Sequence, residues 1–357
     1  MIDLRHDVPL AQHSTLGVGG PARYWLDAAD STVLGAGLAW ARQQGVATLV
    51  LGGGSNVLVS DDGFDGLVLR VGDDSVRWGD VIRVGAGADW NGFVAAAVGR
   101  GLAGVECLAG IPGRVGAAPI QNVGAYGQEV ADRCVSVDVV DRESGDSRTM
   151  SAADCAFAYR HSVFKGALRD RLVVTAVSFR LTRGGAPTLA YRELAQRAEQ
   201  RGATTLAAVS ELVRELRRGK GMLIDPDGPR DPDTASAGSF FTNPLVSPAT
   251  AAKVATEASR RGLGSPPAWP AGDRVKLSAA WLIERAGIAR GDVLGGAGVS
   301  TRHVLALTNR GAATAADLIA LAARVAAAVR AAWGIGLVPE PVFVGFDRPP
   351  DDLLESP

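Results

Sequence analysis

The chain has 357 residues, which is enough for two or three domains of ordinary size, so a single small binding module is excluded. Its 37 basic and 38 acidic residues nearly balance, which gives no overall support for a nucleic-acid surface or an anionic-membrane patch. Three cysteines without CxxC spacing argue against a disulfide scaffold and favour a reducing compartment, and no signal peptide or membrane-spanning apolar stretch is found.

The first half of the sequence alternates β-rich runs with helical segments. After an extended run that begins at Pro21, strands are predicted at 48–51, 57–59, 67–71, 81–84, 135–140 and 172–181, each bounded by Gly or Asp turns. Helices are predicted at 31–44, 89–100, 191–200 and 206–218. A tract rich in Pro, Gly and Asp at 225–232 is typical of a connector between domains.

A second α/β pattern follows the connector. Short strands are predicted at 238–243 and 303–308 and a longer last strand at 335–346. Ser247 reads as an N-cap before a proline at the first helical position, and a second helix is predicted at 276–286. Thr314 and Asp317 resemble a capping box at the start of a long alanine-rich helix that reaches about Trp333. The acidic, proline-rich tail is expected to be frayed.

The most informative motif is a run of three glycines at 52–54, followed by Ser55 and Asn56, between two predicted strands. Glycines let successive backbone N–H groups converge without interference from Cβ atoms, and such a nest binds pyrophosphate oxygens. The motif has neither the Lys-Ser/Thr of a Walker loop nor the following helix of a Rossmann turn. A GxGxxA match at 17–22 also lacks the flanking strand and helix. The residues alone leave open a glycine-rich hairpin without a ligand.

The stretch 108–127 contains several glycines and two prolines, and no regular element is predicted in it. A loop of this length inside a compact domain is usually functional. Its backbone could approach a flat ring closely, while Gln121, Asn122 and Tyr126 offer hydrogen bonds and a stacking face. An Ω-loop packed on itself is the alternative.

Three further segments hold candidate chemical groups, each of which has an ordinary structural alternative. Arg160 lies in a basic and aromatic run at 158–165, Ser239 follows a glycine at 238, and Glu340 stands between two prolines. Together they supply one guanidinium, one hydroxyl and one carboxylate in rigid surroundings. The four histidines have no metal-ligand spacing, and no GxSxG elbow is present, so neither a metal site nor a Ser/His/Asp triad is supported.

At these residues the sequence closely resembles the UDP-N-acetylenolpyruvoylglucosamine reductase family. The matching motifs are GGGSN at 52–56, LAGIPG to VGAYG at 108–127, YRHSVFK at 159–165, GSFFTNP at 238–244 and PEP at 339–341. The resemblance implies an α/β and α+β fold in which two FAD-binding subdomains of the vanillyl-alcohol oxidase type are joined to a smaller α/β substrate-binding domain. The implied boundaries are 1–75 for the first subdomain, 76–228 with 332–357 for the second, and 229–331 for the substrate-binding domain.

The resemblance also implies a cofactor, non-covalently bound FAD, and NADPH as the hydride donor. The residues expected to bind FAD are Gly52, Gly53, Gly54, Ser55, Asn56, Val57, Ile111, Pro112, Gly113, Gly116, Ala117, Ile120, Asn122, Gly124, Tyr126, Val173 and Arg217. Arg160 and Glu340 would stabilise an enolate-like intermediate, and Ser239 would deliver a proton to it. A guanidinium stays charged at any relevant pH, which suits that role.

For the substrate, the resemblance implies a UDP-sugar held by Tyr159, Tyr191, Lys220, Asn243 and Lys276. The family activity would complete UDP-N-acetylmuramate for peptidoglycan synthesis, in a cytoplasmic monomer without a nucleic-acid or membrane partner. The pattern departs from the family around Ser300–His303, where substrate contacts are not assigned.

Two other functions were weighed against the reductase. An oxidase of the wider flavin fold often tethers its flavin through histidine or cysteine, and neither residue occurs at 52–56 or 108–127. A catalytically inactive UDP-sugar-binding protein would have no need of all three groups, Arg160, Ser239 and Glu340.

Overall fold

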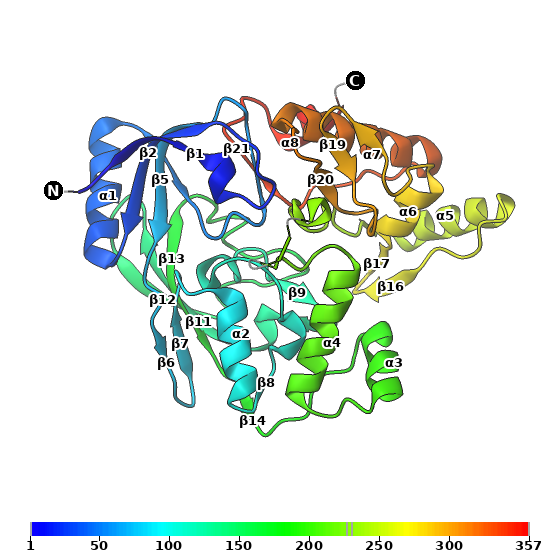
Figure 1. The fold of residues 1–357 in the computed structure, drawn as a ribbon, viewed down its shortest axis with the longest axis horizontal. Coiled ribbons are helices and arrows are strands. Elements are labelled where there is room, and N and C mark those ends of the chain that lie inside the picture. The colour runs from blue at the N-terminus through cyan, green and yellow to red at the C-terminus, as the bar shows by residue number, and fades with distance from the viewer. Residues whose placement is uncertain (1, 226–227, 230, 356–357) are drawn as a thin grey trace. The chain divides into compact units, whose positions relative to one another are not determined.

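A computed structural model describes residues 2–225, 228–229 and 231–355. Its backbone contacts divide the chain into two compact units (Figure 1). Unit 1 comprises Met1–Val8, Pro21–Gly54 and Phe64–Pro226, and unit 2 comprises Pro9–Gly20, Ser55–Gly63 and Asp227–Pro357. The predicted connector at 225–232 lies partly outside the described residues. The three predicted domain boundaries remain a prediction.

Unit 1 is built on two sheets. Its elements are β1 (Arg5–Pro9, whose last residue falls in unit 2), β2 (Pro21–Ala28), α1 (Ser31–Gln44), β3 (Ala47–Val50), β5 (Phe64–Val71), β6 (Val76–Arg77), β7 (Ile82–Gly85), α2 (Trp90–Gly99), β8 (Leu102–Ala103), η2 (Glu106–Leu108), η3 (Val115–Ala117), β9 (Gly124–Ala125), β10 (Gln128–Glu129), η4 (Val130–Asp132), β11 (Cys134–Asp141), β12 (Ser147–Ser151), β13 (Leu172–Phe179), β14 (Thr182–Arg183), α3 (Arg192–Arg201) and α4 (Leu206–Gly219).

The first sheet has the strand order β1-β2-β5-β3, and β5 runs parallel to both β2 and β3. Helix α1 connects β2 to β3 and packs on β2 and β5 (Figure 1). It begins where the Asp30 carboxylate accepts hydrogen bonds from two backbone N–H groups, and it ends at Gly45 in the left-handed region. Leu34, Leu38 and Ala41 recur at helical spacing and are buried, so this face of the helix forms the core of the first sheet.

The second sheet is antiparallel, with the order β12-β11-β13-β7-β6. Its core includes the stacked rings of Phe93 and Phe179, whose centroids lie 5.1 Å apart, with Trp90 beside them. Helix α2 therefore covers this sheet with the face that carries Trp90 and Phe93. The short hairpin β9-β10 and the antiparallel pair β8-β14, whose strands are distant in sequence, lie outside the main sheets.

Unit 2 has a separate hydrophobic core formed by helices and short strands. Its elements are η1 (Leu10–His13), β4 (Val57–Val59), η5 (Pro232–Thr234), β15 (Leu245–Val246), α5 (Pro248–Arg260), β16 (Ala268–Ala271), β17 (Arg274–Leu277), α6 (Ala279–Arg285), β18 (Val293–Leu294), β19 (Ala297–Val299), β20 (Leu307–Asn309), α7 (Ala315–Trp333), β21 (Val342–Val344) and α8 (Pro350–Glu355). The strands form sheets β15-β17-β16 and β18-β19-β20 and the parallel pair β21-β4.

Several predicted elements of unit 2 are wrong in extent. Residues 238–243 form no strand but a single bridge between Phe241 and Pro339, and the predicted last strand shrinks to β21. Lys276 lies in β17, because Ser278 caps the following helix and delays its start to Ala279. His303 precedes β20 rather than starting it, and the tail folds into α8 instead of fraying.

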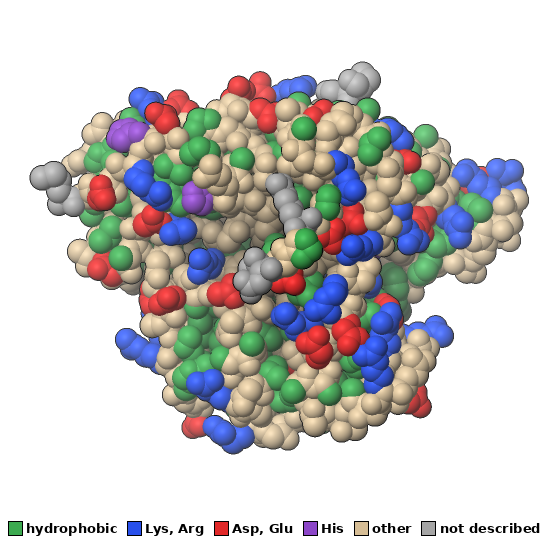
Figure 2. Space-filling model, viewed as in Figure 1, with side chains coloured by type: hydrophobic (Ala, Val, Ile, Leu, Met, Phe, Trp, Pro, Cys, Tyr) green, Lys and Arg blue, Asp and Glu red, His purple; other side chains and the backbone are tan. Residues whose placement is uncertain are grey.

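Charged side chains of both signs are interspersed on the face shown in Figure 2, in keeping with the balanced composition. Among the residues that the structure describes, no helix is long and apolar enough to cross a membrane. The same residues contain no group of three or more His, Cys, Asp or Glu side chains placed to hold a metal ion.

Candidate functional site

The glycine run at 52–54 lies directly against residues 113–117 of the loop at 108–127. A Cβ added to Gly53 would lie 2.6 Å from the Cα of Gly113, and one added to Gly52 would lie 3.2 Å from the Cβ of Ala117. Gly54 also has a φ of 64°, in the left-handed region. The two backbones therefore meet without room for a side chain, and this fits a cradle for the phosphates of FAD. The hairpin alternative is wrong, because β3 pairs with β5 and β4 pairs with β21.

The long loop at 108–127 is ordered by backbone hydrogen bonds to the start of α2 and to Ala86, which follows β7. Trp90 N–H donates to the Gly113 carbonyl at 3.0 Å, and Gly116 N–H donates to the Ala86 carbonyl at 2.9 Å. A Cβ on Gly116 would lie 2.5 Å from that of Ala86, so this contact also requires glycine. The backbone of the loop thus anchors it to the rest of unit 1. The short elements η3 and β9 form within it.

Arg160 stands at the tip of a tight hairpin that is bonded to this loop. Ala158 and His161 exchange two backbone hydrogen bonds of 3.0 and 3.1 Å, and Arg160 between them has a φ of 53°. Its Nη2 donates to the Gly124 carbonyl at 2.7 Å, and the ring of Tyr159 lies 5.4 Å from its guanidinium carbon. The structure therefore joins the predicted catalytic arginine to a predicted cofactor-binding residue.

Two buried polar side chains reinforce this junction. Asn122, 1% exposed, donates to the Ala158 carbonyl at 3.2 Å and to the Glu129 carboxylate at 2.7 Å. Ser162, which is fully buried, donates to the Ile120 carbonyl. Because the side chains of Asn122 and Ser162 are buried and hydrogen-bonded, the hairpin and the loop are fixed relative to each other before any ligand is present.

Arg217 is a buried cation on the last turn of α4. Its Nε donates to the Gly110 carbonyl at 2.9 Å and its Nη2 to the Met222 carbonyl at 2.8 Å. Burial lowers the pKa of Arg217, while Tyr126 acts in the opposite direction. Within the described part of the chain no carboxylate pairs with it, so its positive charge suits a nearby anionic ligand.

Lys220, Tyr126 and Tyr191 form one cluster in unit 1. The two tyrosine rings meet edge to face with centroids 5.3 Å apart, and the Lys220 ammonium lies 5.4 and 5.8 Å from them. Glu193 lies 3.5 Å from the ammonium. Burial disfavours the charge of Lys220, but attraction to Tyr126, Tyr191 and Glu193 outweighs it, so the pKa lies above its ordinary value. Burial raises the pKa of Tyr126. The cluster thus presents a protonated amine between two rings.

In unit 2, Ser239 and Glu340 lie on adjacent backbone segments. Glu340 N–H donates to the Phe240 carbonyl at 2.8 Å, and Thr242 N–H donates to the Val338 carbonyl at 3.0 Å. The Nδ2 of Asn56 donates to the Glu340 carbonyl at 3.2 Å, so this residue of the GGGSN motif also holds the turn that carries Glu340. These backbone bonds therefore bring the segment of Ser239, the predicted acid, next to the segment of Glu340, the predicted carboxylate, although the two segments are far apart in sequence.

The remaining predicted residues occupy structural positions whose ligand roles stay predictions. Asn243 accepts a hydrogen bond from Ala279 N–H at 2.9 Å, at the start of α6. Lys276 lies in β17 with its ammonium 5.9 Å from the Trp269 ring. Val173, in β13 of the second sheet, is 1% exposed and belongs to the same hydrophobic cluster as the buried face of α1. Ser55 and Val57 follow the glycine run, and Pro112 lies in the loop beside Ile111.

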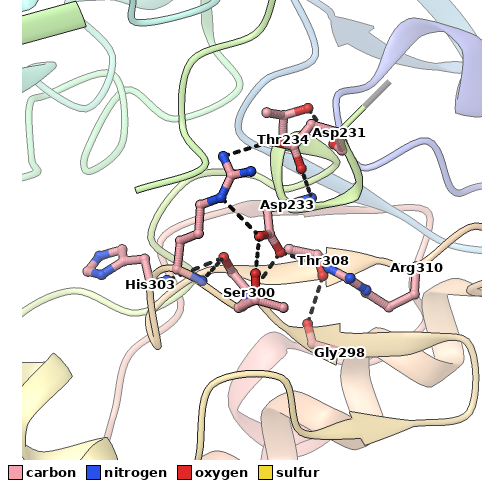
Figure 3. A network of polar contacts seen from close by, with 10 residues as sticks. Asp231, Asp233, Thr234, Gly298, Ser300, His303, Thr308 and Arg310 are labelled. Atoms are coloured by element: carbon pink, nitrogen blue, oxygen red, sulfur yellow. Dashed lines mark hydrogen bonds and ion pairs between the residues drawn. The ribbon is translucent and has the colours of Figure 1, made fainter. Parts of the chain in front are cut away.

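Sequence reasoning missed Asp233, a carboxylate of η5 that lies at the centre of a network of polar contacts (Figure 3). Its carboxylate, 4% exposed, accepts hydrogen bonds from Thr301 N–H and hydroxyl and forms an ion pair of 2.7 Å with Arg310. Ser300 Oγ accepts bonds from the next turn at His303 (Figure 3). Burial disfavours the Asp233 carboxylate, but the bonds from Thr301 and Arg310 outweigh it and lower its pKa. Its place directly after the tract at 225–232, which was interpreted as a connector, hid it.

We expect Asp233→Asn to lower the free energy of unfolding by about 1.5–3 kcal/mol at neutral pH, the range for hydrogen bonds to charged groups. Because the pKa of Asp233 is lowered by folding, its contribution is complete above the pKa of the unfolded chain, about 3.9, and is lost as the pH falls through the folded value. Denaturant unfolding from pH 8 to pH 3 measures this difference.

The matched control is Glu355→Gln, which removes the exposed ion pair with Arg330 and should change the stability by less than about 1 kcal/mol. A difference between Asp233→Asn and the natural protein that stays constant below pH 4 would show that the charge of Asp233 is not its source.

Comparisons with known proteins agree with these features. Residues 28–151 match the family model described as an FAD binding domain, and residues 231–344 match the C-terminal domain of UDP-N-acetylenolpyruvoylglucosamine reductase. The reductase of that name from Thermobifida fusca is 51% identical over 95% of this chain and 97% of its own length. That of Streptomyces coelicolor is 48% identical over 95% and 90%. The crystal structure of the Thermus caldophilus reductase has a TM-score of 0.65 at 26% identity, covering 96% of this chain and 99% of its own.

The two family-model matches fall in both units and include the motifs at 52–56, 108–127, 238–244 and 339–341, while the motif at 159–165 lies between them. They confirm the predicted fold class, an FAD-binding α/β and α+β region followed by a separate C-terminal domain. The glycine cradle and the buried Arg217 fit the cofactor that the first model names. The chain is an FAD-dependent oxidoreductase and belongs to the UDP-N-acetylenolpyruvoylglucosamine reductase family.

Proposed function

We propose that the protein reduces the enolpyruvyl group of UDP-N-acetylglucosamine-enolpyruvate to give UDP-N-acetylmuramate, with NADPH as hydride donor and FAD bound without a covalent link. The observation that carries the proposal is the hydrogen-bonded junction between the Arg160 hairpin and the loop that ends at Gly124. It fixes a guanidinium, which neutralises developing negative charge, to a loop predicted to bind the cofactor. Family membership over 95% of the chain supports the same activity.

Each catalytic group has a task that suits its chemistry. The glycine run at 52–54 and the loop at 108–127 would hold FAD, which would supply hydride transfer from NADPH to the enol-ether carbon of the substrate. Arg160 stabilises the enolate that then develops on the substrate, and Glu340 assists in stabilising it. Ser239 gives its hydroxyl proton to the neighbouring carbon; a serine is a weak acid, but a carbanion-like centre is a strong base, so a well-positioned transfer is feasible.

Substrate binding is assigned to residues away from this chemistry. Lys220 neutralises the diphosphate of the UDP group, and Tyr191 and Tyr126 pack beside it. Tyr159, Asn243 and Lys276 are proposed to contact the same ligand. In this proposal the enzyme acts as a cytoplasmic monomer in peptidoglycan synthesis, and its mass in solution tests the monomer.

The oxidase alternative requires a nucleophile that could attach the flavin. Cys107 is the cysteine next to the predicted flavin loop, and its Sγ donates to the Thr188 carbonyl at 3.3 Å. Burial, together with the charge of Glu106, raises the pKa of Cys107 to about 12, so it remains a thiol rather than a nucleophilic thiolate at neutral pH. This supports non-covalent FAD and disfavours the oxidase.

The visible spectrum of the purified protein tests the proposal. We expect a yellow protein that releases intact FAD on mild denaturation, bleaches with NADPH and regains its colour when the enolpyruvyl substrate is added without oxygen. Flavin that stays attached after denaturation would favour the oxidase. A colourless protein that FAD cannot reconstitute would contradict the proposal entirely, and bleaching without recovery on substrate would favour the inactive binder.

A further inference from the structure

Glu106 is a fully buried carboxylate at the start of η2, the short helix that packs against α4. Its Oε2 accepts a hydrogen bond from Gly104 N–H at 2.7 Å. Its Oε1 accepts from Thr188 N–H at 2.8 Å and from Gln128 Nε2 at 2.9 Å. Within the described residues no Lys or Arg forms an ion pair with it. A buried charge without a counter-ion is costly unless hydrogen bonds compensate for it, so its presence needs a reason.

The partners of Glu106 belong to two segments that are far apart in sequence. Gln128 lies in β10, where it pairs with Ala125 of the β9-β10 hairpin, and its Oε1 also accepts from Cys107 N–H at 2.8 Å. The Thr188 hydroxyl lies 2.9 Å from Gln128 Nε2, so the two segments are also bonded directly. Glu106 therefore binds both the β9-β10 hairpin and the segment at Thr188 through its carboxylate.

Both segments carry a tyrosine of the Lys220 cluster. Tyr126 is at the tip of the hairpin with a φ of 49°, and Tyr191 is three residues beyond Thr188, at the N-cap of α3. Between them, a Cβ on Gly127 would lie 3.0 Å from the Cβ of Ala190. The hairpin and the 188–191 segment are thus packed together, and their bonds to Glu106 set where the two rings stand.

We propose that Glu106 is a positioning residue for substrate binding: it holds the two tyrosines in the geometry in which they flank Lys220. The expected effect on binding of the UDP-sugar rests on the proposed function, whereas the expected effect on the positions of the two tyrosines does not. Within the described part of the chain, Glu106 forms no hydrogen bond or ion pair with Tyr126, Tyr191 or Lys220, so it acts through Gln128 and Thr188. Its loss should weaken binding of the UDP-sugar and leave the chemical step in place.

The chemistry of the carboxylate suggests a graded set of variants. Glu106→Ala removes both acceptors. Glu106→Gln can keep its oxygen toward Gln128 and Thr188 and turn its amide toward Gly104, so it loses one bond and retains the two that hold the tyrosines. Gln128→Leu breaks the side-chain bonds that join the hairpin to Glu106, Cys107 and Thr188 but leaves the bond from Thr188 N–H to Glu106, and it serves if Glu106→Ala does not fold. Asp138→Asn is the matched control, because Asp138 is a partly buried carboxylate of unit 1 that bonds Arg83 and Thr149 in the second sheet.

Steady-state kinetics, flavin content and hydrogen exchange are measured on the FAD-loaded proteins. We expect Glu106→Ala and Gln128→Leu to raise KM for the UDP-sugar roughly 5- to 30-fold, as the loss of one or two buried hydrogen bonds implies, with kcat within about twofold. Glu106→Gln should restore KM to within about threefold of the natural value. Amides at 124–129 and 187–191 should exchange faster in Glu106→Ala than in Asp138→Asn, and Asp138→Asn should leave KM unchanged.

Unchanged KM in both disruptive variants would overturn the inference, and so would a rise in KM of the same size in Asp138→Asn. If the natural protein itself fails to turn over the UDP-sugar, the proposed function fails. Hydrogen exchange then still decides the role of Glu106: faster exchange confined to the two segments supports it, and uniform change overturns it.

Discussion

Ser239→Ala is expected to slow the oxidation of reduced enzyme by the enolpyruvyl substrate by roughly 10²- to 10⁴-fold, the range for a lost general acid. Reduction of the enzyme by NADPH should stay nearly normal, because no proton has to reach the substrate carbon in that half-reaction. Alanine keeps the backbone at 239, so the Phe240 bonds to Leu305 and Glu340 can persist. Stopped-flow absorbance of the flavin measures the two half-reactions separately.

The control for this variant is Ser247→Ala. Ser247 is the N-cap of α5 in the same unit, and its Oγ accepts a hydrogen bond from Thr250 N–H at 3.1 Å. Losing that cap should cost about 1 kcal/mol of stability and leave both half-reactions unchanged. Equal slowing of both half-reactions by Ser239→Ala would mean that the serine supports the cofactor rather than delivering a proton, and its assigned role would be wrong.

Helix boundaries were the most predictable part of this fold, because local chemistry sets them. The capping box of Thr314 and Asp317 and the Ser247-Pro248 start are present as expected, and α1 spans the predicted residues. Ser278 is the same kind of signal, and giving it more weight would have corrected the helix predicted to begin at Lys276.

Extended segments were less predictable, since a strand needs a partner that the sequence does not identify. Residues 238–243 and 335–346 are β-rich, yet they meet through the bridge at Phe241 and Pro339 and a few backbone bonds. The candidate residues Arg160, Ser239 and Glu340 were found from motifs. Glu106 and Asp233 were not, because an acidic residue looks alike in sequence whether it is solvated or buried, and burial depends on contacts between distant segments.

Lys220→Ala is expected to raise KM for the UDP-sugar by roughly 10- to 150-fold, the equivalent of a charged hydrogen bond of about 1.5–3 kcal/mol. A diphosphate carries its charge far from the reacting carbon, so Lys220 stabilises ground and transition states alike, and kcat should change much less. Lys253→Ala, which removes an exposed lysine of α5, is the control for charge and should leave KM unchanged.

Tyr191→Phe keeps the ring that meets Tyr126 and loses only the hydroxyl, so its KM should rise by roughly 3- to 10-fold, as for a neutral hydrogen bond.

Glu193 adds a second argument about Lys220. The ammonium that lies 3.5 Å from Glu193 balances this carboxylate, so removing the lysine leaves a negative charge next to the place proposed for the diphosphate. The rise for Lys220→Ala should therefore lie in the upper part of its range, and it should shrink in Lys220→Ala/Glu193→Gln. A collapse of kcat at constant KM would instead place these residues in the catalytic step and contradict their role in binding the UDP group.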